Sequence, residues 1–339
     1  MKILHITRSY YPNIGGIEKH IEEFSKLLMR NNEVFVLTED NEGKLSNEEV
    51  YQGIKIHRID TSGTNEKNKK WKIWKWMIKH KTWLQGFDVI HFHDVFFWII
   101  PLLIFKLPKL FITFHGYEGF ELPTLKQKFW HKLGEKLTVG NICVGGFYTK
   151  WYGTSPNYVI FGGVDPASKL NKSKNPKAIF IGRLQEDTGI TEYIKSLKGT
   201  KLTLDVFGDG PQMEEAKKLA MELKVDVTFF GFVAVAADKV KNYKVAFVSR
   251  YLSILEAFIS KVPVIAHYNN EIKYDYLMTT PFHSWVNIAH TSEEIRSNLE
   301  KITKDKKKTK TDVNAAYNWA KEQTWEKAAE TYYKLWKLK

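Results

Sequence analysis

The alternation of strand and helix patterns, repeated in two halves, is the feature that most constrains how this chain folds. Short apolar runs that end in turn residues are separated by helical segments, and the pattern restarts after Asp165. Such alternation predicts parallel sheets covered by helices on both faces. In the first half the predicted strands are Ile3–Ile6, Glu33–Leu37, Phe87–Phe92, Leu110–Phe114 and Asn141–Val144. In the second half they are Ala178–Ile181, Leu202–Phe207, Asp226–Phe229, Val245–Val248 and Pro263–Ala266.

Two domains follow from the length of 339 residues and from a polar break in the middle of the chain. Residues 166–176 carry Lys, Asn and Ser without apolar periodicity, and each flanking half has about the size of one doubly wound domain. We predict a Rossmann-like domain at residues 1–165, a second at residues 166–320, and a terminal helical segment at residues 321–339 that is rich in aromatic residues and lysine.

The composition excludes several classes of protein. The 43% of hydrophobic residues suffice for ordinary cores, and the single cysteine, Cys143, cannot form an internal disulfide. The longest apolar run, Val95–Phe105, contains Pro101 and is shorter than the about 20 residues that span a bilayer, so we interpret it as a buried helix. The first residues lack the pattern of a signal peptide. We expect a cytoplasmic protein that is soluble or attached to one membrane face.

Two positions at strand ends suggest binding of an anion. Gly15 and Gly16 lie in the turn before the first helix, where backbone amides and the helix N-terminus favour a negative charge. The alternative is a tight turn that needs glycine for its own geometry. Arg183 follows the first strand of the second half, where a guanidinium can bind phosphate through two hydrogen bonds. The alternative is an ordinary surface arginine.

Two further loops of the second half are candidates for the same ligand. Gly208 begins a Gly-Asp-Gly-Pro turn, which is either a sharp reversal or a loop that faces a ligand. Tyr251, Leu252 and Ser253 precede Glu256, which we expect to open a helix directly after a strand. Their amides can face a diphosphate, and the carboxylate can accept hydrogen bonds from two ribose hydroxyls. The alternative is a carboxylate that only complements the helix dipole.

Histidines gather at two strand ends of the first half. His91, His93 and Asp94 end one strand, and His115 ends the next. The His-x-His spacing suggests a metal, but strand alternation places both rings on one face without a clear third ligand. We therefore expect no metal site. Histidines at neighbouring strand ends suit hydrogen bonds to a sugar or a phosphate, and His115, before a glycine, is the better placed.

Together these segments resemble family 4 of the retaining glycosyltransferases. The motifs GGIEKH, TFHG, GGVD, IGRL, FGDGP and LEA followed by PVI occur in the order and spacing of that family, over nearly the whole chain. The resemblance implies the GT-B fold, in which two Rossmann-like domains face each other, the second binds most of the donor, and a C-terminal helix returns to the first. It also implies a sugar-nucleotide donor, UDP- or GDP-linked, with no metal or other cofactor.

The resemblance implies a role for each candidate residue. The amide of Gly16 binds the donor diphosphate, and His115 lies beside the donor sugar. Arg183 neutralises the leaving diphosphate, and Glu256 binds the ribose. His115, Arg183 and Glu256 are thus the expected catalytic residues. Gly15, Gly16, Arg183, Gly208, Arg250, Tyr251, Leu252, Ser253 and Glu256 are the expected donor-binding residues.

The sequence departs from the family at two positions. Thr188 stands where the family carries a phosphate-binding lysine, before Gly189. Val248 stands where the family carries the first of two glutamates, eight residues before Glu256. The glycine-rich loop of the family, which follows position 248, is shortened here to Ser249-Arg250-Tyr251. We hypothesise that Arg250 supplies the missing positive charge.

A basic segment of the first half suggests contact with an anionic membrane. Between Lys67 and Lys81 there are seven lysines and no acidic residue, and the net charge of the chain is +13. At about 100° per residue, Trp76 and Trp83 border the lysine stripe, as expected of a helix in a lipid headgroup layer. The alternative is a solvated lysine face whose tryptophans pack on the domain. We expect residues 67–83 to bind lipid and not nucleic acid, since no nucleic-acid module accompanies them.

These features predict a retaining glycosyltransferase that transfers a sugar from a nucleoside-diphosphate donor to a lipid or lipid-linked glycan acceptor at the inner face of the cell membrane. Two alternatives remain open. One is a sugar-nucleotide epimerase of the same fold, which needs no acceptor. The other is a sugar-nucleotide-binding protein without catalytic activity, which Val248 and Thr188 favour.

Overall fold

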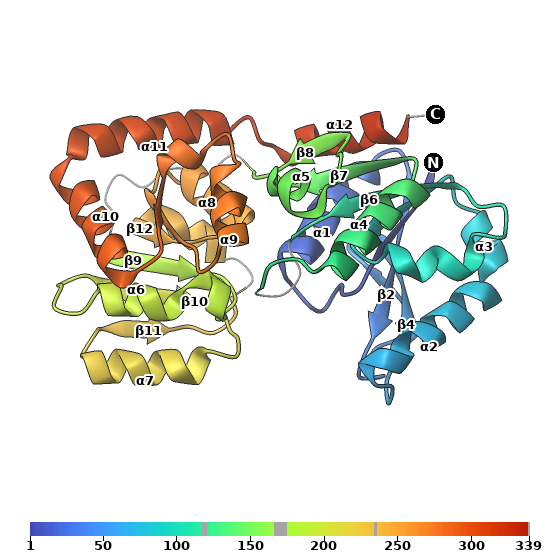
Figure 1. The fold of residues 1–339 in the computed structure, drawn as a ribbon, viewed down its shortest axis with the longest axis horizontal. Helices are drawn as coiled ribbons and strands as arrows, with labels where there is room; N and C mark the ends of the chain where they lie inside the picture. Colours follow the sequence, from blue (N-terminus) through green and yellow to red (C-terminus); the bar gives the residue numbers. More distant parts are fainter. Residues whose placement is uncertain (117–120, 166–174, 234–235, 338–339) are drawn as a thin grey trace. The chain divides into compact units, whose positions relative to one another are not determined.

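The computed structural model describes residues 1–116, 121–165, 175–233 and 236–337. The chain divides into two compact units (Figure 1). Unit 1 comprises residues 1–117, 123–160 and 325–339, and unit 2 comprises residues 118–122 and 161–324. Of the predicted break at 166–176, only Asn175 and Pro176 lie within the described residues, and they begin a strand.

Unit 1 is built on an eight-stranded sheet with the order β3-β4-β2-β1-β5-β6-β7-β8. All neighbouring strands run parallel except β3, which pairs antiparallel with β4 at one edge. The strands are β1 (Lys2–Thr7), β2 (Glu33–Asp40), β3 (Glu48–Tyr51), β4 (Ile54–Asp60), β5 (Val89–His93), β6 (Lys109–Phe114), β7 (Gly140–Val144) and β8 (Tyr158–Ile160).

Side-chain alternation shows which helices cover each face of the first sheet. His5 of β1 meets Phe24 of α1, with ring centroids 5.4 Å apart, and His91 of β5 meets Tyr332 of α12 at 4.9 Å. Phe114 points to the other face, where its ring stacks on His131 of α4. The helices are α1 (Gly16–Leu28), α2 (Glu66–Lys79), α3 (Lys81–Gln85), the 3₁₀ helix η1 (Phe96–Leu102), α4 (Leu125–Leu137), α5 (Phe147–Tyr152) and α12 (Trp325–Trp336).

Unit 2 is a six-stranded, fully parallel sheet with the order β11-β10-β9-β12-β13-β14. The strands are β9 (Asn175–Ile181), β10 (Thr203–Phe207), β11 (Val227–Phe229), β12 (Tyr243–Phe247), β13 (Val264–His267) and β14 (Val286–Ala289). The helices are η2 (Glu186–Thr188), α6 (Ile190–Ser196), α7 (Met213–Leu223), η3 (Ala236–Asn242), α8 (Tyr251–Ile259), α9 (Glu271–Met278), η4 (His283–Trp285), α10 (Ser292–Lys304) and α11 (Lys306–Ala320).

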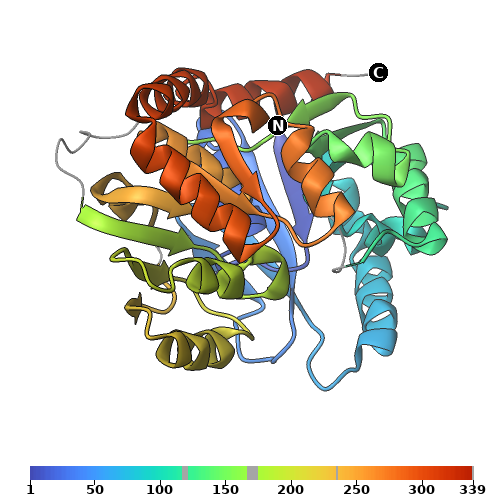
Figure 2. The same cartoon turned by 60° about the vertical axis from the view of Figure 1, so that its left-hand side comes forward.

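One face of the second sheet carries a large apolar core. Buried side chains of α6, α7 and α10 pack there against strands β9, β10, β12 and β13. Tyr193 of α6 stacks on Phe247 of β12 with ring centroids 4.4 Å apart. Helix α11 instead contacts α8. The strands of unit 2 therefore lie between two helical layers (Figures 1 and 2).

The fold class predicted from the sequence is confirmed. Each unit has a parallel sheet covered by helices, and the C-terminal helix α12 belongs to unit 1, where it packs on α1, β7 and β8. The alternation pattern did not reveal strands β3, β4, β8 and β14, of which three have only three or four residues. Among the described residues, none of the helices has the length and apolar character needed to cross a bilayer.

The expectation of a buried helix in the apolar run Val95–Phe105 is corrected in part. The run contains the 3₁₀ helix η1, Phe96–Leu102, in which Pro101 has no amide hydrogen for an α-helical ladder. Its last residues are not buried, because the side chain of Ile104 is 86% exposed. The basic stretch Lys304–Lys310 is mostly exposed and belongs to two helices, since α10 ends at Lys304 and α11 begins at Lys306.

Glycines allow the loops after β9 and β10 to approach each other closely. Gly182 donates its amide to the carbonyl of Phe207, and Leu184 donates to the carbonyl of Asp209, at 3.1 and 2.9 Å. Gly208 has a φ of +148°, and a Cβ added there would overlap the carbonyl oxygen of Gly182. Glycine is required at this position because both the backbone angle and the space exclude a side chain.

We expect Gly208→Ala to destabilise unit 2 by roughly 2–4 kcal/mol, because overlap with a backbone carbonyl adds to the backbone strain. Gly199→Ala is the matched control: Gly199 has a φ of +76°, but no atom lies within 4 Å of an added Cβ. That variant should lose only about 1 kcal/mol. Chemical denaturation measures both, and equal losses would contradict the close approach.

Candidate functional site

Three loops of unit 2 meet because their strands are neighbours. Strand β9 lies between β10 and β12, so the loops that leave their carboxyl ends adjoin one another. These loops carry Arg183, Gly208 and Arg250, which the sequence proposed for one ligand. Open parallel sheets bind ligands at this edge. The structure thus brings the predicted residues of the second half together.

The loop after β9 is closed by a threonine. The hydroxyl of Thr188 lies 2.8 Å from the carbonyl oxygen of Arg183 and 2.7 Å from that of Gln185. The side chain of Arg183 is exposed, whereas Thr188 is only 3% exposed. The position at which the resembling family has a lysine therefore points into the loop in this chain. It serves the loop geometry and contributes no charge.

Arg250 is held by an ion pair inside unit 2. Its guanidinium donates to the carboxylate of Asp187, which lies in η2 and is fully buried. Arg250 is also the residue before the first turn of α8. The ion pair therefore fixes a cation at a helix N-terminus and ties the loop after β12 to the loop after β9.

Lys273 is a candidate that sequence reasoning missed. It lies on α9, its side chain is completely buried, and its ammonium donates to the carbonyl of Ser249 at 2.6 Å. The same nitrogen lies 4.5 Å from the ring centre of Tyr276. Burial, followed by the charge of Arg250, holds the pKa of Lys273 well below its usual range. The available signal was helical spacing, which places Lys273 on the same face as the buried Tyr276 and Leu277.

Helix α8 begins earlier than we expected. It starts at Tyr251, so Glu256 lies in the second turn and does not open the helix. The amide of Tyr251 donates to the hydroxyl of Tyr276 at 3.0 Å, and the two rings stack with centroids 3.9 Å apart. This amide is therefore already used within the protein, and Leu252 and Ser253 carry the next amides of the first turn. Both side chains are half-buried.

The glycine turn of unit 1 already holds a carboxylate. Helix α1 begins at Gly16, with Gly15 as its N-cap. Burial raises the pKa of Glu18, although hydrogen bonds from its own amide, from Ser9 and from the amide of Gly15 oppose that rise. A Cβ at Gly15 would overlap the carboxylate of Glu18. Glycine at this position therefore makes room for Glu18, and an anionic ligand that uses the Gly15 amide has to displace that carboxylate.

His115 lies at the carboxyl end of β6, next to other histidines. Its Nε2 is 2.7 Å from Nδ1 of His93, and its backbone amide donates to Asp94. Its ring also meets His20 of α1, with centroids 5.1 Å apart. His91 and His93 are buried on one face of β5, as predicted. Burial, and then the neighbouring histidines, hold the pKa values of His91, His93 and His115 well below 6.5.

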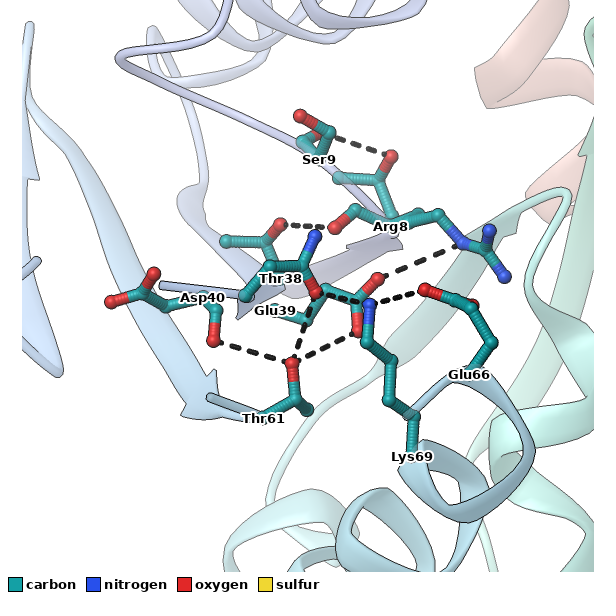
Figure 3. A network of polar contacts seen from close by, with 10 residues as sticks. Arg8, Ser9, Thr38, Glu39, Asp40, Thr61, Glu66 and Lys69 are labelled. Carbon is teal, nitrogen blue, oxygen red and sulfur yellow. Dashed lines mark hydrogen bonds and ion pairs between the residues drawn. The ribbon is translucent and has the colours of Figure 1, made fainter. Parts of the chain in front are cut away.

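The same edge of unit 1 carries a polar network that the sequence did not reveal (Figure 3). Glu39, at the end of β2, is 3% exposed, and its carboxylate lies 3.7 Å from Nε of Arg8 and 3.3 Å from the hydroxyl of Thr61. Lys69 of α2 donates to Glu66 beside it. The Arg8 side chain is 59% exposed, and its terminal nitrogens point away from the network in Figure 3. A buried carboxylate thus orients an exposed guanidinium at this edge.

The histidines at the ends of β5 and β6 were considered above as possible metal ligands. Within residues 1–116, 121–165, 175–233 and 236–337, no group of three or more His, Cys, Asp or Glu side chains is placed to hold a metal ion. The available ring nitrogens of His91 and His93 are engaged by protein partners.

Two protein families match the two halves of the chain. Residues 14–167 match Glycosyltransferase Family 4, and residues 164–319 match Glycosyl transferases group 1. Models of glycosyltransferase domains thus match residues 14–319 in two parts, and the chain has the GT-B fold. A relative of known sequence, an uncharacterized glycosyltransferase of Methanocaldococcus jannaschii, is 27% identical over 222 residues. That match spans 62% of this chain and 60% of the relative's length.

Solved structures of similar fold come from several glycosyltransferases. Sucrose-phosphate synthase from Thermosynechococcus elongatus superimposes with a TM-score of 0.78 at 15% identity, over 99% of this chain and 98% of that chain. Anabaena HepE in complex with UDP and glucose has a TM-score of 0.74 at 15% identity, over 98% of each chain. TarM of S. aureus, solved with UDP and a sugar-glycerol compound, has a TM-score of 0.72 at 10% identity, over 99% of each chain.

We expect unit 1 to lose stability in mild acid. Burial lowers the pKa of His5 to about 3 and that of His20 to about 4, whereas an unfolded histidine titrates near 6.5. The unfolded state therefore takes up protons first as the pH falls, and stability is lost below about 6.5. From pH 7 to pH 5 these two residues should cost about 2 kcal/mol each.

Denaturant titrations across this pH range measure the loss of unfolding free energy. In His20→Asn the loss between pH 7 and pH 5 should be smaller by about 2 kcal/mol, the contribution of one histidine. A free energy of unfolding that stays constant between pH 7 and pH 5 would contradict the burial of neutral imidazoles.

Proposed function

We propose that this chain is a retaining glycosyltransferase that transfers a sugar from a UDP- or GDP-linked donor to a lipid or lipid-linked glycan acceptor. The observation that carries the donor part is the meeting of three loops at the carboxyl edge of the unit 2 sheet, where exposed Arg183, Arg250 and the N-terminus of α8 lie on adjacent loops. HepE and TarM, which share the fold, were solved with UDP.

Each residue at this edge has a chemical role in the proposal. Arg183 binds the diphosphate through two hydrogen bonds and stabilises the charge that develops as it leaves. The first-turn amides of Leu252 and Ser253 add the positive end of the helix dipole. Glu256 accepts hydrogen bonds from the ribose hydroxyls. In unit 1, Gly16 supplies an amide to the diphosphate and His115 a hydrogen bond to the donor.

Catalysis in this proposal needs no metal ion, because positioning and fixed positive charge stabilise the leaving group. The cation that the family places at position 188 is replaced by Arg250, which the ion pair with Asp187 keeps at the N-terminus of α8. Lys273 lies behind it and adds to the positive potential when protonated. The chain thus has cations at this edge despite the loss of the family's lysine.

A second candidate function is sugar-nucleotide binding without turnover. It is favoured by the burial of Val248, which occupies the place of the family's first glutamate and is 1% exposed. It is also favoured by Asp187, whose charge offsets that of Arg250. A donor panel incubated with membrane extract separates the candidates: transferred sugar supports a transferase, an epimeric sugar nucleotide formed without acceptor supports an epimerase, and binding alone supports the second candidate.

We expect Arg183→Ala to weaken binding of UDP or GDP about ten- to a hundredfold, because a charged hydrogen-bond pair to phosphate is lost. Arg250→Ala combined with Asp187→Asn, which leaves no unpaired buried carboxylate, should weaken it less but measurably. Lys218→Ala on α7 is the control, because that side chain is 77% exposed and pairs with Glu222 along its own helix. Calorimetric titration with each nucleotide measures the affinities. Unchanged affinity in both arginine variants would remove the donor site from this edge.

The proposal also includes attachment to an anionic membrane through residues 67–83. The support from the structure differs from that predicted by the sequence. Trp83 packs on Phe35 and Phe87, and Trp76 packs on Trp83, so these two tryptophans lie against the domain. Trp71 and Ile78 are the exposed apolar side chains of α2, at 58% and 46%.

The exposed apolar residues of α2 lie among lysines. On the helix, Trp71 and Ile78 lie on one stripe, with Lys75 and Lys79 beside it and Lys67 at its start. Indole and lysine together suit the headgroup layer of an anionic membrane. Helix η1 packs on α2, and Ile104, just beyond it, is 86% exposed. Unit 1 thus offers both the apolar and the basic side chains that peripheral attachment requires, and a protein so attached would act at the inner face of the cell membrane.

We expect replacement of Lys67, Lys75 and Lys79 by Gln to weaken binding to anionic vesicles on the order of a hundredfold, since each lysine near the surface contributes about 1 kcal/mol. The matched control replaces Lys306, Lys307 and Lys310 of α11, which removes equal charge from unit 2. Flotation with phosphatidylserine vesicles and with neutral vesicles measures binding. Equal flotation of both triple variants would show that net charge alone, and not α2, is responsible.

A further inference from the structure

One face of the unit 1 sheet carries a row of histidines under two helices. Parallel register places His5 of β1 opposite His91 of β5, and His93 opposite Thr113 of β6. Since alternate residues of a strand share a face, all four side chains point to the same side. Helices α1 and α12 cover that side, and three of these residues are completely buried, with His93 1% exposed.

A first chain of hydrogen bonds crosses this row and ends in α1. The indole of Trp336 donates to Nδ1 of His91 at 3.0 Å, and because indole only donates, His91 must carry its own proton on Nε2. That Nε2 lies 2.8 Å from the hydroxyl of Thr113, which lies 2.9 Å from that of Tyr332. Tyr332 in turn meets Nε2 of His20 at 2.9 Å. This chain fixes the rings beneath α12.

A second chain runs along the row to the strand ends. Nδ1 of His5 lies 3.0 Å from Nε2 of His93, and Nδ1 of His93 lies 2.7 Å from Nε2 of His115. Each neutral ring has one N–H and one lone pair, so all donors in the chain must point the same way. The direction is decided at the inner end, where Nε2 of His5 is buried and has no hydrogen-bond partner.

An unpaired buried N–H is rarer than an unpaired buried acceptor. Nε2 of His5 is therefore the bare acceptor, so His5 donates through Nδ1 to His93, and His93 donates through Nδ1 to His115. His115 then accepts on Nε2 and carries its proton on Nδ1, the nitrogen that remains for a ligand. Unlike the four buried rings of the row and of α1, the ring of His115 is partly exposed.

We propose that His5 and His93 are positioning residues that hold His115 as the uncharged Nδ1–H tautomer, with its ring orientation fixed, so that it presents a hydrogen-bond donor. The inference rests on the proposed function for its purpose, because the ligand of that donor is an oxygen of the sugar-nucleotide. Its physical content, the position of one proton, does not depend on activity. A donor fixed in advance stabilises charge on a ligand oxygen without reorganisation during the reaction.

The surroundings of His115 agree with an uncharged ring. Among the described residues, the titratable and charged groups near it are His20 on α1, His93 and Asp94 at the end of β5, and Tyr148 on α5, whose hydroxyl donates to the carbonyl of Gly116. The Asp94 carboxylate accepts the backbone amide of His115. Burial lowers the pKa of His115 despite this nearby carboxylate.

The proton position is tested by nitrogen NMR of the full chain with ¹⁵N-labelled histidine, assigned with a His115→Asn variant. We expect His115 to show a protonated Nδ1 and a bare Nε2, and to remain uncharged down to pH 5. A proton on Nε2, or titration of His115 near 6.5, would overturn the proposal whether or not the chain proves to be a transferase.

Three variants test the positioning role. His93→Phe cuts the second chain and should let His115 exchange tautomers and titrate toward its ordinary pKa, with a loss of roughly three- to tenfold in kcat and little change in KM. His93→Gln, whose amide can accept from His5 and donate to His115, should restore both. His91→Gln is the control. It also removes a buried imidazole of β5, but one that belongs to the first chain of hydrogen bonds and not to the second, which ends at His115.

A His115 spectrum that is the same in wild type and in His93→Phe would refute positioning by His93. If His93→Phe does not fold, the proposal is still tested by the proton position of His115 in the wild type and by its spectrum in His93→Gln. If the spectra follow the expectation but no donor or acceptor supports turnover, the proposed function fails and the tautomer assignment stands.

Discussion

Parallel strand pairing is the constraint on which the rest of this structure depends. It brings the carboxyl end of every strand to the same edge of its sheet, so residues far apart in sequence become neighbours wherever their strands are neighbours. In unit 2 this constraint joins the loops that follow β9, β10 and β12. In unit 1 it aligns histidines from β1 and β5 with the end of β6. The sheet topology therefore brings the candidate residues together, and local contacts then fix the orientation of their side chains.

These local contacts have one feature in common. At the carboxyl edge of each sheet, charged side chains are partly neutralised by other groups of the protein. Asp187 pairs with Arg250, Glu39 lies beside Arg8, and the carboxylate of Glu18 accepts the amide of Gly15. Such internal partners fix side chains in advance, which lowers the conformational cost of binding. They also compete with an anionic ligand, so affinity depends on the difference between the two sets of contacts. A dianionic diphosphate outcompetes a single carboxylate most readily where its second charge finds a further donor, as exposed Arg183 provides.

Much of the fold could be predicted from the sequence because its strands and helices follow from the local periodicity of apolar residues. The strands that end at Thr7, His93 and Phe114 are apolar runs that stop at polar residues, and helix α1 follows a glycine pair. The site could be predicted only where a motif marks a loop, as at Arg183 and Gly208. Lys273 and Asp187 carry no such mark, since their importance arises from burial against residues distant in sequence. The start of α8 was misplaced by five residues because Arg250 and Tyr251 offer no N-cap side chain of the usual kind.

The two departures from the family pattern have different physical meanings. Thr188 is bound into its loop by its own hydroxyl, which lies near two carbonyl oxygens, so a lysine there would lose these contacts and bury an ammonium. Val248 is buried directly after β12, where a glutamate would be stable only if a partner compensated its buried charge. The carboxyl edge of the unit 2 sheet thus does not simply lack the two charged residues of the family. It contains the Arg250–Asp187 ion pair as well. At this edge, positive charge from the loop after β12 and from α9 lies beside that of Arg183 in the loop after β9.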